Sequence, residues 1–139
     1  EELADAGYIK QTVSRKKANV QNQLNEYQSV EGYKILVGKN NKQNDLITTV
    51  LASKNDLWFH VKNIPGSHVV VFCGGKEVSD QTITQAATLA ALNSKAANSS
   101  NVAVDYTPVK YVKKPNGAKA GMVIYTTNKT AYVTPKEEK

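Results

Sequence analysis

Apolar residues recur along the chain in short runs that predict strands separated by polar turns. Residues 32–38, 57–61 and 68–72 read GYKILVG, LWFHV and HVVVF, with the alternating or continuous apolar pattern of strands. Pro65 and Gly66 predict a turn between the last two. Further short strands are expected within 101–106, 109–112, 121–127 and 130–135, with Asn128 and Lys129 joining the last two in a tight hairpin.

Two segments have the pattern of helices. Residues 79–97 begin with the capping residues Ser79 and Asp80, and small or apolar residues recur at helical spacing at positions 83, 86, 87, 90, 94 and 97. A shorter helix is expected over LITTVLAS, residues 46–53, capped by Asn44 or Asp45. The pattern predicts an α+β fold, in which an antiparallel-rich sheet carries one principal helix.

The first thirty residues differ in composition from the rest. Residues 8–30 are polar and rich in Gln and Asn, which suits either a solvated helix or a linker. The composition changes sharply at Gly32. We therefore expect an N-terminal helical or linker segment over 1–30 and a folded domain over 31–136, in a piece of a longer protein.

Charge and cysteine content narrow the class of protein. The net charge is +6, and between residues 81 and 136 the only acid is Asp105, against seven lysines. Such a basic field suits a partner with phosphates or an acidic surface. The single cysteine, Cys73, cannot form an internal disulfide, and no apolar run approaches the ~20 residues of a membrane span. We expect a soluble, cytoplasmic domain without a membrane partner.

The only tryptophan and both histidines lie in one stretch, residues 56–72. Alternation along the first strand places Trp58, His60 and Lys62 on one face. That face either receives a base, sugar or phosphate, or is covered by the helix. His60, His68 and Cys73 lack the ligand number and spacing of a zinc site, and GKNNKQND lacks the spacing of a nucleotide-binding loop. No metal and no cofactor is expected.

A basic finger is predicted over residues 106–121, YTPVKYVKKPNGAKAG. Four lysines there alternate with Tyr106 and Tyr111, and Asn116-Gly117 marks a turn at the tip. Lysines on such a loop bind phosphates without reading sequence, although a charge run is often only a solvated surface. Candidate RNA-binding residues are Lys39, Lys62, Lys110, Tyr111, Lys113, Lys114 and Lys119.

These segments, in this order, resemble the NFACT-R domain. The matching blocks are GKNNKQND, DLWFHVKNIPGSHVVV, AATLAALNSKA and VDYTPVKYVKKPNGAKAGMVIYT followed by KT, which together cover roughly residues 31–135. Tyr111 stands where the family commonly has His, so stacking or hydrogen bonding carries over but an acid–base role does not. Positions that match the family signature are Asn44, Asp45, Asp56, Trp58, Phe59, His60, Pro65, Gly66, Ser67, His68 and Lys95.

The resemblance implies a function for the parent protein. NFACT-R is the C-terminal RNA-binding domain of RqcH-type proteins, which act in ribosome-associated quality control and are also labelled fibronectin-binding proteins. It implies that residues 1–30 end a coiled coil, and that the partners are the rest of the parent, large-subunit ribosomal RNA and tRNA during C-terminal alanine tailing. We expect a non-catalytic docking domain. The alternative is a protein-interaction or adhesion module that binds fibronectin, and a hydrolase or nuclease ranks third.

Overall fold

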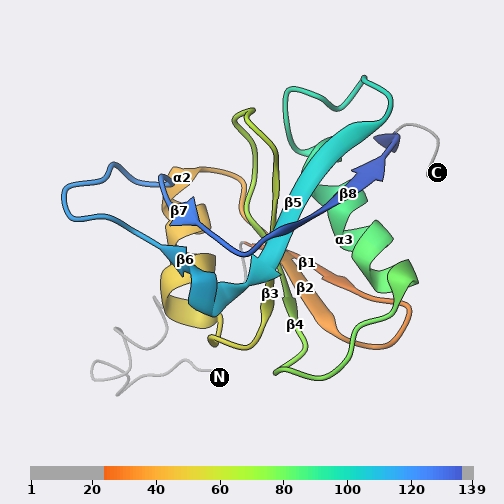
Figure 1. Ribbon diagram of the computed structural model, residues 1–139, viewed down its shortest axis with the longest axis horizontal. Coiled ribbons are helices and arrows are strands. Elements are labelled where there is room, and N and C mark those ends of the chain that lie inside the picture. Colours follow the sequence, from red (N-terminus) through yellow and green to blue (C-terminus); the bar gives the residue numbers. More distant parts are fainter. Residues whose placement is uncertain (1–23, 136–139) are drawn as a thin grey trace, which may run out of the picture.

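A computed structural model describes residues 24–135, and a six-stranded antiparallel sheet forms its centre (Figure 1). Each neighbouring pair of strands is antiparallel. The strands lie in the order β1 (Asn25–Gln28), β2 (Lys34–Val37), β4 (Val69–Phe72), β3 (Leu57–Val61), β5 (Val102–Pro108) and β8 (Lys129–Val133). The predicted α+β class is confirmed.

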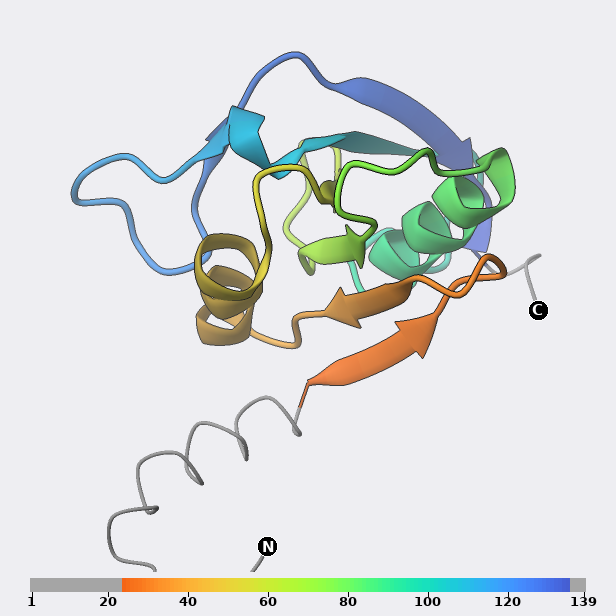
Figure 2. The same cartoon turned by 90° about the horizontal axis from the view of Figure 1, so that it is seen from below.

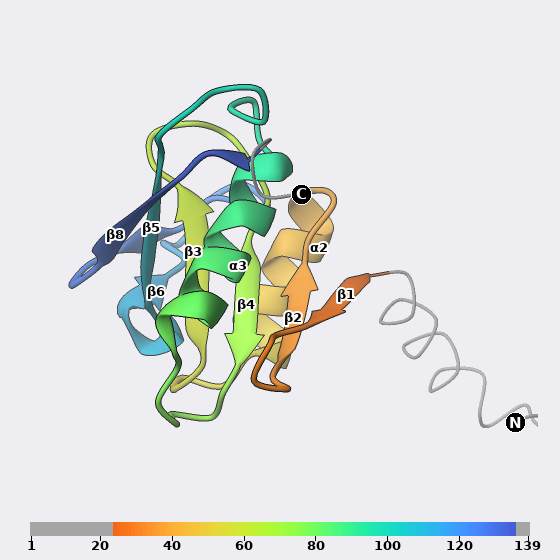
Figure 3. The same ribbon diagram turned by 90° about the vertical axis from the view of Figure 1, so that its right-hand side faces the viewer.

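The principal helix, α3 (Asp80–Leu92), covers one face of this sheet, as Figure 3 shows. It begins where Ser79 accepts a hydrogen bond from the amide of Thr82 at 3.3 Å, which satisfies one unpaired first-turn donor. The small residues Ala86, Ala87, Ala90 and Ala91 are fully buried against the sheet. Phe59 and Val61 point toward this helix from β3, so the main core lies between α3 and the sheet.

The other face carries a short helix and a two-stranded ribbon (Figure 2). Helix α2 (Asn41–Asp45) continues into a π-helical turn, Leu46–Leu51, whose Ile47 packs with Trp58 and Val70 in a second core. After β5, a 3₁₀ turn (Val109–Tyr111) leads into β6 (Val112–Lys113), which pairs with β7 (Ile124–Tyr125). The intervening loop 114–123, with β6 and β7, forms the finger.

The structure corrects several local predictions. Asn40, and not Asn44 or Asp45, caps the short helix, because its side chain accepts from the amide of Gln43 at 2.9 Å. The expected hairpin at Asn128 and Lys129 is wrong, since β7 pairs with β6 while β8 pairs with β5. The segment 109–112 is mostly a 3₁₀ turn.

Two element boundaries also differ from expectation. Helix α3 ends at Leu92, so Ser94 and Ala97 lie beyond it. Asn25–Gln28, inside the segment assigned to a connector, forms the edge strand β1 because its backbone pairs with β2. The end of a coiled coil was predicted for residues 1–30, and residues 1–23 of that segment lie outside the described residues.

Candidate functional site

Four rings meet on the sheet face opposite α3. Trp58 is fully buried, stacks on His60 with centroids 5.7 Å apart, and meets the edge of His68 at 5.2 Å. Tyr125 of β7 approaches the indole at 4.8 Å. Strand periodicity brings these rings together, since Trp58 and His60 alternate with the core residue Phe59 along β3. The structure confirms that Trp58 and His60 share one face of the sheet, and this face is covered not by α3 but by the π-helical turn Leu46–Leu51 and the finger ribbon.

The two histidines are held by neutral hydrogen-bond partners. Nδ1 of His68 lies 2.8 Å from Oγ1 of Thr48, and Nδ1 of His60 lies 2.6 Å from the carbonyl oxygen of Val61. Burial lowers the pKa of His68 to about 4, with the neighbouring His60 adding to the effect. Burial also lowers the pKa of His60. Both imidazoles are therefore neutral at pH 7, so they do not offer a positive charge to a phosphate.

Asn44 and Asp45 each accept a hydrogen bond from the backbone of a neighbouring segment. Oδ1 of the buried Asn44 accepts from the amide of His68 at 3.0 Å, and Gly38 allows this approach because a Cβ there would overlap the Asn44 side chain. Oδ1 of Asp45 accepts from the amide of Gly121 at 2.9 Å. Gly121 has φ +83° and contacts Asn41, a conformation and closeness that favour glycine.

A hollow of about 430 Å³ opens beside the four rings. Its walls are the rings, Asn41, and the loops 63–66 and 120–123, which come from distant parts of the sequence. The indole Nε1 of Trp58 is buried and has no hydrogen-bond partner among the described residues. A buried N–H group without an acceptor lowers the stability of a fold, so the indole nitrogen of Trp58 contributes unfavourably to the stability of this site.

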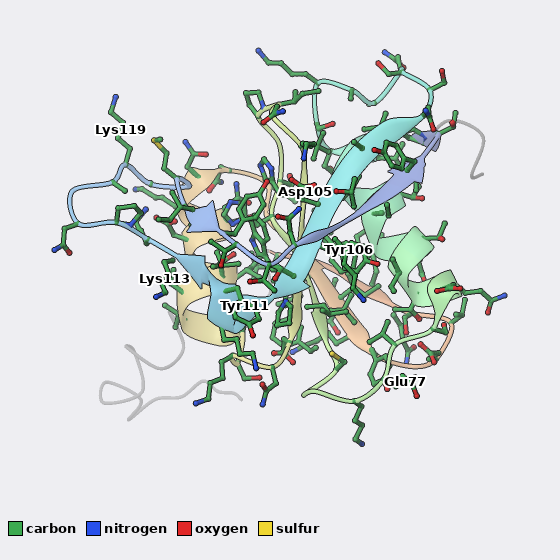
Figure 4. All side chains as sticks on the ribbon, viewed as in Figure 1. Glu77, Asp105, Tyr106, Tyr111, Lys113 and Lys119 are labelled. Atoms are coloured by element: carbon green, nitrogen blue, oxygen red, sulfur yellow. The ribbon has the colours of Figure 1, made fainter. Side chains whose placement is uncertain are left out.

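The finger lysines fall into two groups. Lys113 and Lys119 are exposed, and Figure 4 shows Lys119 extending away from the body of the domain. Lys114 instead bonds inward: its Nζ lies 3.3 Å from the Asp45 carboxylate, 2.6 Å from the carbonyl of Lys119 and 3.4 Å from that of Met122. Lys114 therefore holds the base of the finger together.

The remaining candidate RNA-binding residues do not join the finger lysines. Lys62 lies 3.7 Å from the buried carboxylate of Asp105. Lys39 is exposed just after β2, and its amide donates to Gln43 at 2.8 Å. Lys110 and Tyr111 line a different hollow, at the end of β5.

Asp105 has a structural role that was not predicted from the sequence. Its carboxylate accepts from Tyr125 Oη at 2.7 Å and from Thr130 Oγ1 at 2.8 Å, which ties the finger ribbon to the main sheet. Burial, and then the bond to Asp105, raises the pKa of Tyr125. The sequence does contain a signal for this role, because Asp105 is the only acid in a long basic segment and lies within a strand pattern.

Other signature residues shape the backbone. Asp56 accepts from the amides of Ser53 at 2.9 Å and Gly74 at 2.8 Å, and so braces two turns. Gly66, which follows Pro65, pairs with Ser94 beyond α3, and the amide of the buried Ser67 donates to Asn93 at 3.3 Å. The exposed Lys95 comes next along the chain.

Two kinds of feature are absent from residues 24–135. Within this range no three His, Cys, Asp or Glu side chains are grouped so that they could hold a metal ion. Within it, too, no helix has the length and apolar character needed to span a membrane.

Comparisons with known proteins place the chain among characterised sequences. The Rqc2 homolog RqcH of Bacillus subtilis (strain 168) is 51% identical over 138 residues, which are 97% of this chain and 24% of that protein. The Rqc2 homolog RqcH of Streptococcus suis (strain 05ZYH33) is 46% identical over 140 residues, covering 100% of this chain and 25% of that protein. The chain thus spans about a quarter of the length of these curated relatives.

A solved structure has the same fold. It is the C-terminal part of the fibronectin/fibrinogen-binding protein from Streptococcus suis, with a TM-score of 0.78 and 48% identity over 83% of this chain and 46% of that chain. The fibronectin label is a misnomer, and it gives no support to adhesion by this chain. A family model described as the NFACT protein RNA binding domain matches residues 23–127. The chain therefore belongs to the NFACT RNA-binding domain family.

Proposed function

We propose that this chain is an RNA-docking domain that works in ribosome-associated quality control in the cytoplasm. Its partners are large-subunit ribosomal RNA or tRNA, and its parent supports C-terminal alanine tailing on stalled large subunits. The observation that carries the proposal is the finger, because it presents Lys113 and Lys119 to solvent from a base fixed by Asp45 and Lys114. The family description supports RNA as the class of partner.

The chemistry of the finger suits a phosphate backbone. Exposed ammonium groups on a loop bind phosphate oxygens and displace counterions, which gives affinity without sequence reading. The hollow beside Trp58 lies at the base of the same loop, and its walls are neutral and include the four rings. We assign the phosphate contacts to the exposed lysines and the shape of the surface to the ring cluster.

The domain is proposed to be non-catalytic. Nδ1 of each imidazole is occupied by a hydrogen-bond partner, Thr48 for His68 and the Val61 carbonyl for His60. Among the described residues that line the hollow there is no carboxylate, hydroxyl nucleophile of serine or threonine, or thiol. Nucleophilic catalysis assisted by a histidine requires such a nucleophile exposed in the hollow beside the imidazole.

The test is a titration of the chain with large ribosomal subunits, free tRNA and an unrelated duplex RNA at two salt concentrations. We expect subunits or tRNA to bind more tightly than the duplex, and the double variant Lys113→Ala/Lys119→Ala to weaken this binding. Lys34→Ala is the control for loss of one exposed lysine elsewhere, to be compared with Lys113→Ala and Lys119→Ala singly, since Lys34 is exposed at the end of β2 remote from α2. Equal affinity of the double variant and the native chain for all three RNAs would refute the finger assignment.

The same titration distinguishes RNA docking from the alternative function, fibronectin binding. Fibronectin is added in place of RNA, and RNA is then used as a competitor. Binding of fibronectin that persists at high salt and resists RNA would overturn the proposal in favour of an adhesion module.

A further inference from the structure

A second hollow lies at the other side of the 3₁₀ turn, where β3 begins and β5 ends. Its volume is about 500 Å³, within the range of small-molecule pockets. Two tyrosines, Tyr106 and Tyr111, and three lysines, Lys76, Lys110 and Lys129, line it. We call this hollow the tyrosine–lysine cleft.

The fold supports the ring of Tyr106 and the backbone of Tyr111, and both side chains are only partly buried. Tyr106 stacks on the core residue Phe59, with ring centroids 5.2 Å apart and an interplanar angle of 15°. The carbonyl of Tyr111 accepts from the amide of Thr126 at 3.2 Å, which fixes the 3₁₀ turn to the segment after β7. A ring that is already packed on the core, as Tyr106 is, loses little conformational freedom when a base stacks on it. Stacking of this kind does not depend on which base is bound.

The charge of the cleft is one-sided. All three lysines are exposed, and none of the described residues that line the cleft is acidic. The ammonium group of Lys110 lies 5.3 Å from the centre of the Tyr111 ring, so charge and aromatic surface adjoin. Burial, and then the nearby Asp80, raises the pKa of Tyr106, so its phenol stays neutral and does not repel phosphate.

The cleft is continuous with the finger through the chain itself. Lys110 and Tyr111 end the 3₁₀ turn, and Lys113 follows two residues later in β6. In Figure 4, Tyr111 lies between Lys113 and Tyr106. The cleft residue Lys110 is thus three residues along the chain from the finger residue Lys113.

From this arrangement we infer that the tyrosine–lysine cleft receives an unpaired nucleotide of a bound RNA. Its base stacks on Tyr106 or Tyr111, and its phosphates contact Lys76, Lys110 and Lys129. The inference rests on the proposed RNA-docking function and adds a preference for single-stranded segments. A duplex keeps its bases stacked inside, so it can use the finger but not the cleft.

The test compares a labelled single-stranded oligouridylate with a blunt RNA duplex of the same length by fluorescence anisotropy. Tyr111→Leu is expected to weaken single-strand binding about fivefold or more while changing duplex binding less than twofold. Lys76→Gln, which leaves the core intact, is expected to lower the single-strand salt slope by about 0.7. Lys95→Gln is the charge-matched control, because it lies beyond the opposite end of α3 from the cleft residue Ile83.

The outcomes separate this inference from the proposed function. If Tyr111→Leu and Lys76→Gln bind single strands like the native chain while Lys113→Ala/Lys119→Ala does not, the cleft assignment is wrong and RNA docking stands. If the native chain binds large subunits or tRNA but not the single strand, the cleft inference fails and RNA docking stands; if it binds none of these RNAs, both proposals fail. Selective loss of single-strand affinity in the two cleft variants supports the inference.

Discussion

Alanine substitutions at the neighbouring lysines Lys113 and Lys114 should change RNA binding in different ways. Lys113 is exposed, whereas the ammonium group of Lys114 lies 3.3 Å from the Asp45 carboxylate and 2.6 Å from the carbonyl of Lys119. The charge of Lys114 is therefore largely balanced within the protein. We expect Lys113→Ala to remove a phosphate contact and Lys114→Ala to loosen the finger.

The expected magnitudes follow from these contacts. Loss of one phosphate contact lowers the slope of log K against log salt by about 0.7 for single strands and about 0.9 for duplexes. Over a fourfold change in salt this corresponds to roughly a threefold difference in affinity. The side chain of Lys114 is 28% exposed, so its ion pair is worth about 0–1 kcal/mol, and each carbonyl bond adds about 0.5–1.5 kcal/mol. Together these contacts hold the base of the finger by about 1–4 kcal/mol, so Lys114→Ala should weaken binding by a factor between about five and several hundred, equally at every salt concentration.

The assay is a salt titration of RNA affinity for the native chain and both variants. In a plot of log K against log salt concentration, we expect the native chain and Lys114→Ala to give parallel lines. Lys113→Ala should give a shallower line. Asp45→Asn serves as a second probe of the finger base, since it removes the ion pair but keeps an acceptor for Gly121. The reasoning is refuted if Lys114→Ala lowers the slope as much as Lys113→Ala does.

Three further predictions concern stability, each measured by urea unfolding. Asn44→Ala should cost about 1–3 kcal/mol, because it leaves the buried amide of His68 unpaired; a cost below about 0.5 kcal/mol would contradict this. The pKa of His68 is about 4 when folded and near 6.5 when unfolded, so the unfolded state binds more protons and stability falls by about 2 kcal/mol from pH 7 to pH 5. That loss should shrink in His68→Gln. Tyr125→Phe should cost about 1.5–3 kcal/mol through its lost bond to Asp105, and no measurable cost would show that this bond is dispensable.

Local patterns predicted much of the fold. The alternation in LWFHV placed Trp58 and His60 on one face and Phe59 on the other, because side chains alternate across any strand. Ser79 and the alanine stripe predicted α3 and the face it buries, since capping and helical spacing are also local. Such features depend on residues within one or two turns, so tertiary context did not change them.

Pairings between distant segments could not be predicted in this way. The hairpin expected at Asn128 and Lys129 was wrong because β8 pairs with β5, while β7 bonds to Asp105 through Tyr125 and pairs with β6. The two neighbouring lysines of the finger likewise carry identical charges in the sequence. Only the position of Asp45, which lies 69 residues from Lys114, distinguishes their roles.

The signature residues are best understood as a scaffold for two loops. His60 lies beside the loop 63–66 and His68 beside Gly121, so the ring cluster lies between the turn after β3 and the end of the finger. Both imidazoles are neutral at pH 7, so the ring cluster adds no charge to the surface. Variants in the cluster should therefore displace the finger and lower RNA affinity without altering the salt slope, whereas variants of exposed lysines should alter the slope itself. The salt slope thus distinguishes residues that position the surface from residues that touch the phosphates.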